Sequence, residues 1–193
     1  MTKEALLQFY LNTNLASLLV AQEIVKHFSH KIISKNQLFL AAGKISDEYL
    51  FLENGYMRAF AYDTDGNDIT TAFCSPGDLV LEVASFFNRT RSKENIQALT
   101  DCEGWYITYE SLNGLFHELP QFREIGRSVL VKILSDLKNR MLITITESAE
   151  ERYRELLKTN PGIFQHASLK NIASYLGITD TSLSRIRKEL AMK

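Results

Sequence analysis

The segment SLKNIASYLGITDTSLSRIRKEL, residues 168–190, has the pattern of two short helices joined by a glycine-containing turn. Ser168 is a suitable N-cap for the first helix, and Thr179 or Asp180 can cap the second. Gly177 stands between the helices, where the chain needs a residue that tolerates a left-handed backbone. The expected inner face comprises Leu169, Ile172, Ala173, Leu176, Ile178, Leu183, Ile186 and Leu190. This spacing predicts a helix-turn-helix.

The outward face of the second helix carries short hydroxyl side chains and cations. Hydroxyls at its start allow close approach to a DNA groove, and Arg185, one turn further, can reach two acceptors on a guanine edge. Lys170, Arg187 and Lys188 can neutralise phosphates. The residues predicted to bind DNA are Lys170, Thr179, Asp180, Thr181, Ser182, Ser184, Arg185 and Lys188.

The charge of the chain indicates that any basic surface is local. Residues 166–193 hold five Lys or Arg and two acidic residues, 5 − 2 = +3, whereas the whole chain carries −1, so the remainder carries −4. This asymmetry favours a DNA-binding C-terminal segment. The alternative is a helical pair that docks on a protein partner and has an ordinary solvated basic face.

Composition narrows the class of protein. At 193 residues, with 45% hydrophobic and 23% charged residues, the chain fits a soluble globular protein. It lacks a signal-peptide pattern and a membrane-spanning apolar run, so we expect a cytoplasmic protein with no membrane partner. Cys74 and Cys102 are expected to be reduced, buried thiols, and His27 and His30 lack a third metal ligand nearby. We therefore predict no metal, no certain cofactor, no catalytic residues and no enzyme activity.

Short β-like runs fill residues 31–109, separated by turn-forming residues. The runs are KIIS, QLFLAA, EYLFLENGYMRAFAYD, DITTAF, LVLEVASFF, IQALTD and EGWYITY. Asn54-Gly55 and Asp65-Gly66 can supply the positive φ of tight hairpins. Because strands and helices do not alternate here, we predict an antiparallel β jelly-roll within an α+β protein.

Helical patterns flank this β region. Residues 4–28 predict one or two amphipathic helices, with a candidate break at residues 12–14. Residues 120–145 predict a long helix whose apolar stripe is too wide for one neighbour; its 4-3-4 positions are Leu130, Leu134, Leu137 and Met141. We expect one side to pack on the β-roll and the other on a second copy of the chain. The alternative is a helix packed wholly within one monomer.

Taken together, these patterns resemble the Crp/Fnr family of bacterial transcription regulators, in particular its Bacteroidetes-type branch. The motifs that carry the resemblance are FCSPGDLVLEVASFF (73–87), SDLKNRM (135–141) and IASYLGITDTSLSRIRKEL (172–190). The resemblance implies a cyclic-nucleotide-binding-like β-roll with N-terminal helices (1–118), a dimerisation helix (119–146) and a helix-turn-helix DNA-binding domain (147–193). Two recognition helices, each 180–190, would read a roughly palindromic operator, with RNA polymerase as a further partner.

The resemblance also implies where an effector would bind. Family members that bind cyclic nucleotides use a Gly-Glu pair for the ribose and a following Arg-Ser or Arg-Thr for the phosphate. Glu82 stands at the acid, but Leu81 replaces the glycine, and Ser92 falls where the arginine is expected. This mismatch argues against a cyclic nucleotide, because a buried phosphate needs a cation. The candidate ligand-binding residues are Glu82, Val83, Arg91 and Ser92.

Three ligand hypotheses stay open: a cyclic nucleotide, another small molecule in the same cavity, and no ligand. The predicted function is a homodimeric DNA-binding transcription regulator, gated by an unknown small ligand if one binds in the β-roll. The alternative function is a ligand-sensing protein-interaction module without DNA binding.

Overall fold

Two short helices open the chain. The computed structural model describes residues 2–191. Helix α1 (Glu4–Leu11) and helix α2 (Leu18–Lys26) are separated by a loop in which Asn14 has φ +58°. The Ser17 hydroxyl caps α2 by accepting from the backbone N–H of Val20 at 3.4 Å. The predicted helical region thus forms two helices with a break near Asn12–Asn14.

The β region forms two four-stranded antiparallel sheets. Their strands are β1 (Ser29–Ile33), β2 (Leu38–Leu40), β3 (Glu48–Asn54), β4 (Met57–Tyr62), β5 (Asp68–Cys74), β6 (Leu79–Val80), β7 (Asn95–Ala98) and β8 (Cys102–Thr108). The sheet orders are β1-β8-β3-β6 and β2-β7-β4-β5. The two sheets enclose a cluster that includes Leu50, Leu52, Met57 and Ile96. This architecture confirms the predicted antiparallel β-roll within an α+β fold.

Two local expectations in the β region were wrong. Gly55 does have a positive φ, +94°, but the turn at Asn54-Gly55 carries the chain from the first sheet to the second, so β3 and β4 do not pair. Of these two predicted turns, the one around Gly66 does close a hairpin, between β4 and β5. The run LVLEVASFF is a two-residue strand followed by helix α3 (Val83–Asn88), because the Glu82 carboxylate caps that helix.

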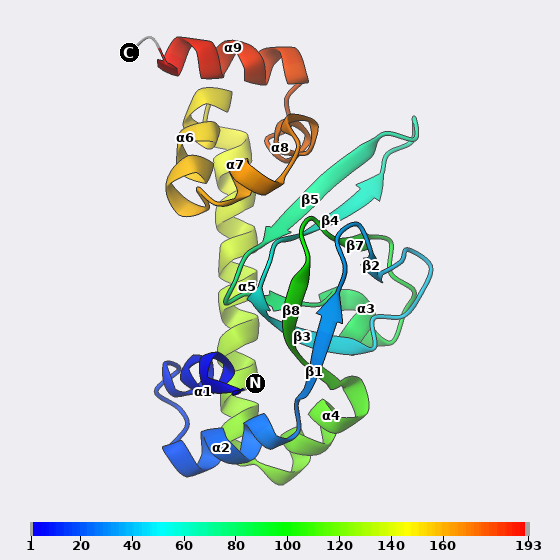
Figure 1. Cartoon of the computed structure of the whole chain (residues 1–193), viewed down its shortest axis with the longest axis vertical. Coiled ribbons are helices and arrows are strands. Elements are labelled where there is room, and N and C mark those ends of the chain that lie inside the picture. The colour runs from blue at the N-terminus through cyan, green and yellow to red at the C-terminus, as the bar shows by residue number, and fades with distance from the viewer. Residues whose placement is uncertain (1, 192–193) are drawn as a thin grey trace.

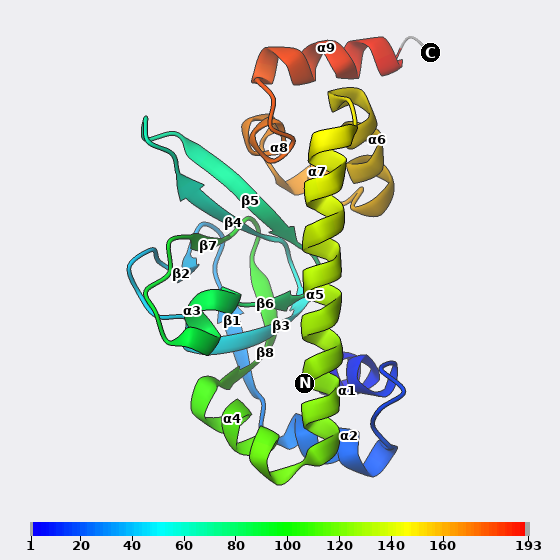
Figure 2. The same ribbon diagram turned by 180° about the vertical axis from the view of Figure 1, so that it is seen from behind.

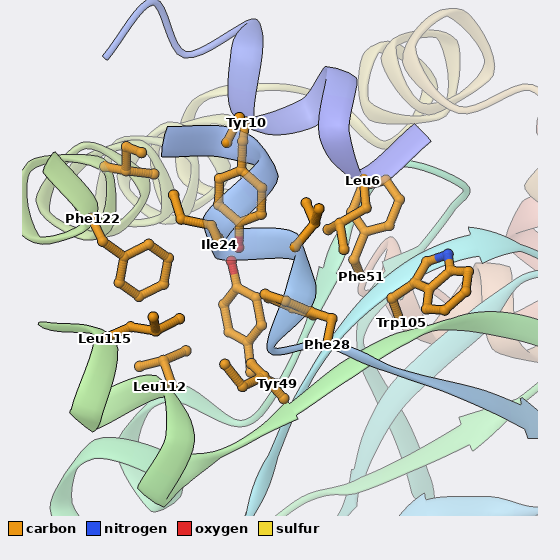
Figure 3. Close-up of a cluster of buried hydrophobic side chains, with 14 of the residues drawn as sticks. Leu6, Tyr10, Ile24, Phe28, Tyr49, Phe51, Trp105, Leu112, Leu115 and Phe122 are labelled. Atoms are coloured by element: carbon orange, nitrogen blue, oxygen red, sulfur yellow. The ribbon is translucent and has the colours of Figure 1, made fainter. Parts of the chain in front are cut away.

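A long helix runs beside the roll (Figures 1 and 2). Helix α4 (Tyr109–Glu118) leads into α5 (Pro120–Thr146), which begins at a proline, a residue suited to the first helical turn. The first turns of α5 are buried at Phe122 and Ile125, against α1, α2 and α4. Figure 3 shows this core, with the hydroxyl groups of Tyr10 and Tyr49 pointing toward one another.

Four helices complete the described chain: α6 (Ala149–Thr159), α7 (Ile163–His166), α8 (Leu169–Tyr175) and α9 (Asp180–Ala191). Ser148 and Glu151 form a capping box that starts α6 directly after α5. The C-terminal helices share a core that also includes Leu99 of the roll. Gly162 packs against the roll so closely that an added Cβ would lie 2.0 Å from the Tyr56 hydroxyl. Lys193, counted above in the C-terminal charge, lies outside the described residues.

Candidate nucleic-acid interface

The turn between α8 and α9 has the hydrogen bonds of a Schellman motif. The Gly177 N–H donates to the Ser174 carbonyl at 3.0 Å, and the Ile178 N–H donates to the Ala173 carbonyl at 3.0 Å. Gly177 has φ +67°, the left-handed conformation that its position predicts. The turn therefore ends α8 sharply and sends the chain into α9.

Both helices are capped by side-chain hydroxyls. Ser168 accepts from the backbone N–H of Asn171 at 3.2 Å, and Thr179 accepts from that of Ser182 at 3.3 Å. Thr179, rather than Asp180, is thus the cap of α9. Its hydroxyl also lies 2.9 Å from that of Thr181. The first turn of α9 therefore presents a connected group of hydroxyls.

The inner faces of α8 and α9 meet in the C-terminal core. The residues of these two faces that are fully or nearly fully buried are Ile172, Ala173, Leu176, Leu183 and Ile186. Ile178 and Leu190 pack against this core and are partly buried. Leu169 was expected on the inner face, but 41% of its surface is exposed, because it begins α8 on the solvent side of the helix.

The opposite face of α9 is open to solvent. Thr181, Ser184, Arg185 and Lys188 are all exposed and follow the i, i+3, i+4, i+7 spacing of one helical face. Lys170, Thr179 and Asp180 are exposed beside them, whereas Ser182 is half-buried. Among residues 2–191, Arg185, Arg187 and Lys188 have no acidic partner within 4.0 Å. The cations are therefore available to an external anion.

The middle of α5 presents the apolar stripe that the sequence indicated. Its large hydrophobic side chains are exposed in the single chain, and Leu134 and Leu137 keep 67% and 62% of their surface in contact with solvent. The other exposed members are Leu130, Val131, Met141, Leu142 and Ile145. Figure 1 shows that between α1 and α6 no element covers the side of α5 that faces away from the roll. Within one chain, the described residues therefore leave much of this stripe open to solvent.

The candidate ligand residues are already engaged inside the chain. The two Glu82 carboxylate oxygens accept from backbone N–H groups at the start of α3, at 3.1 and 2.7 Å. The buried Ser92 hydroxyl donates to the Glu94 carbonyl at 2.8 Å and accepts from its N–H at 3.0 Å. Val83 begins α3, and Arg91 is exposed. In this conformation Glu82 and Ser92 bind the backbone rather than leave free groups for a ribose or phosphate.

Sequence reasoning missed the residues that attach α8 to the roll. Asn171 and Ser174 of α8 are hydrogen-bonded to β4 and β5, and Tyr175 contacts β5. Their partners include the buried Arg58, whose position within a strand gave no sign of a contact 113 residues away. No local sequence pattern identifies such a contact.

Groups of three or more His, Cys, Asp or Glu with metal-binding geometry are absent from residues 2–191. Over the same described range, no helix has both the length and the apolar content required to cross a bilayer.

These features define the class of the molecule: a β-roll joined through a long helix to an exposed helix-turn-helix. Residues 30–118 match the family described as "Cyclic nucleotide-binding domain". The transcriptional activator protein Anr of Pseudomonas protegens is 24% identical over 188 residues, which cover 91% of this chain and 75% of that protein.

Solved structures share the same architecture. FixK2 from Bradyrhizobium japonicum is 19% identical with a TM-score of 0.73, covering 86% of this chain and 85% of its own. A regulator of the Crp/Fnr family from Eubacterium rectale is 16% identical with a TM-score of 0.71, covering 96% and 88%. Residues 30–118 therefore match a cyclic nucleotide-binding domain, the chain is similar in sequence to a transcriptional activator, and it shares the fold of solved proteins that include a Crp/Fnr-family regulator.

Proposed function

We propose that this chain regulates transcription as a cytoplasmic homodimer that binds duplex DNA through α9. The observation that carries the proposal is the exposed face of Thr181, Ser184, Arg185 and Lys188, which lies opposite the buried face of the same helix. Short side chains followed by an arginine fit a major groove, where guanine offers two acceptors to one guanidinium. Lys170 and Arg187 flank this face and suit phosphate contacts.

Dimerisation through α5 would give the two copies of α9 a fixed separation. The uncovered stripe of α5 supports this proposal because a large apolar surface on a regulator favours a partner helix. The proposed organisation is a sensor unit (1–118), a dimerisation helix (119–146) and a DNA-binding unit (147–193). A two-fold dimer implies a roughly palindromic operator with half-sites about one helical turn apart, and bound dimers would contact RNA polymerase.

The internal hydrogen bonds of Glu82 and Ser92 favour a ligand other than a cyclic nucleotide, or none, in this conformation. Isothermal titration with cyclic AMP tests this directly: heat of binding at micromolar concentrations would contradict it. Membership of the Bacteroidetes-type branch stays a prediction.

A salt titration separates DNA binding from the alternative protein-interaction function. If Lys170, Arg187 and Lys188 of both subunits neutralise about six phosphates, the logarithm of affinity for random duplex DNA should fall against log salt with a slope of about −5. No binding at low salt would favour the protein-interaction module.

A base-reading role for Arg185 is tested after selecting an operator from a random duplex pool. Arg185→Ala should weaken operator binding by about 1–3 kcal/mol and leave dimerisation intact. The matched control is Arg154→Ala, because Arg154 is an exposed arginine on α6 that pairs with Glu150 of the same helix. Equal loss in both variants would show a general charge effect rather than base reading.

A further inference from the structure

Helix α8 packs against the free edge of β5 (Figure 1). Strand β5 is the last strand of the second sheet, so one side of its backbone has no neighbouring strand. The Thr70 N–H on this strand donates to the Ser174 hydroxyl of α8 at 2.8 Å. A side chain of the helix-turn-helix therefore satisfies an edge group of the roll.

The next residue of β5 is a β-bulge held by the long helix. Ala59 pairs with Ala72 and Phe60 pairs with Thr70, so Thr71 is an extra residue without a cross-strand partner. The Arg140 guanidinium of α5 donates to the Thr71 carbonyl. One bulge thus joins the β-roll to α5.

The same arginine also contacts α8. Its guanidinium lies over the Tyr175 ring, 4.1 Å from the centroid, and Tyr175 packs on Phe73 of β5 with ring centroids 4.9 Å apart. Arg140 therefore contacts the roll and the helix-turn-helix at once, from a helix that belongs to neither.

A second arginine makes a similar connection from inside the sheet. The Arg58 side chain on β4 is only 8% exposed and pairs with both oxygens of Asp68 at 2.7 Å. Its Nη1 group also donates to the Asn171 side-chain oxygen of α8 at 3.2 Å. Its other acceptors are Thr70 and Gln97. Asn171, Ser174 and Tyr175 follow i, i+3, i+4 spacing, so one face of α8 receives all these contacts.

We propose that Arg58 and Arg140 are positioning residues for DNA recognition: they hold α8 on the bulged edge of β5 and thereby fix the direction of α9. This inference rests on the proposed function. Because α8 and α9 share a tight turn and a buried core, the direction of α9 follows that of α8. Without the two arginines, the C-terminal helices would still be attached through the short 147–148 junction, the Thr70–Ser174 hydrogen bond and the packing of Tyr175 on Phe73. The other remaining contacts are those of Leu99, Tyr56 and Ser75.

The positioning role predicts a loss specific to two-site binding. A dimer gains affinity for a full operator only when both recognition helices are aligned at the correct separation. The test variant combines two substitutions. Asn171→Ala removes the α8 acceptor of Arg58 but leaves Arg58 paired with Asp68. Arg140→Ala removes the contacts of α5 with Thr71 and Tyr175. Arg154→Ala is the control for loss of one exposed positive charge.

We compare affinity for a full operator with affinity for a duplex that holds one half-site. The ratio should fall about tenfold in the double variant and stay unchanged in the control. Hydrogen exchange of the α8 and β5 amides should rise in the double variant, because the junction opens more often. An unchanged ratio, or equal losses on both duplexes, would overturn the positioning role.

A failure of the proposed function gives a different result. If the parent chain binds no DNA at low salt, the proposed function fails. Hydrogen exchange alone then tests whether Arg58 and Arg140 hold α8 on the roll. Faster exchange in α8 would then support the attachment, whereas unchanged exchange would overturn it.

Discussion

Replacing Leu134 by alanine should strongly weaken the proposed dimer. Removing three carbons costs about 2.4 kcal/mol if they become fully buried, at about 0.8 kcal/mol for each carbon. Leu134 keeps 67% of its surface exposed in the single chain, so association can bury at most that share, worth about 1.6 kcal/mol. A two-fold interface contains the residue twice, which gives about 3 kcal/mol, or an increase in dimer Kd of about 200-fold.

Sedimentation equilibrium over a wide range of protein concentration measures this dimer Kd. Because alanine favours helix, the folded monomer should keep its stability. Leu38→Ala is the matched control: Leu38 is an exposed leucine on β2, which lies on the far side of the roll from α5 (Figure 1). An unchanged Kd in Leu134→Ala, or equal weakening in the control, would show that the stripe on α5 is not the interface.

Three further predictions concern stability and thiol chemistry. Leu183→Ala should lower the free energy of unfolding by about 2–5 kcal/mol in urea titrations, whereas the exposed Leu169→Ala should change it little; equal effects would contradict the inner face described above. Gly177→Ala should destabilise by about 1–2 kcal/mol in thermal unfolding, because φ is +67° there; an unchanged melting temperature would argue against the turn. Cys74 is half-buried rather than buried as expected, but desolvation raises the pKa of its thiol from 9.0 to about 12, so native protein should react slowly with thiol reagents at pH 8 and rapidly once unfolded. Since the native thiol holds its proton more tightly than the unfolded one, its contribution to stability is complete below pH 9.0 and declines as pH rises toward about 12; pH-dependent unfolding curves that stay flat there would contradict this.

The parts of the fold that follow from local pattern could be predicted from the sequence. The caps at Ser168 and Thr179, the glycine turn at Gly177 and the period of α5 depend on residues within one or two turns of each other. The exposed face of α9 follows from the same helical period. Such features need no knowledge of distant segments, although the pattern left the cap open between Thr179 and Asp180 and placed the half-buried Ser182 on the outward face.

Features that depend on distant segments could not be predicted in this way. Asn54-Gly55 has the local chemistry of a hairpin, but sheet pairing with β8 and β7 separates the two strands that it joins. The run after Val80 is apolar enough for a strand, yet the Glu82 cap and the buried Phe86 make it a helix. The engagement of Ser92 depends on its turn with Glu94, which the residue-by-residue comparison with the family did not reveal.

The attachment of α8 has a consequence for the roll on its own. A fragment ending at residue 146 would lose the Ser174 hydroxyl, which would leave the Thr70 N–H on β5 without its acceptor. A strand with open backbone groups can recruit an identical strand from another molecule. Truncation before the last helices would therefore leave an open sheet edge on the roll and favour self-association of the fragment.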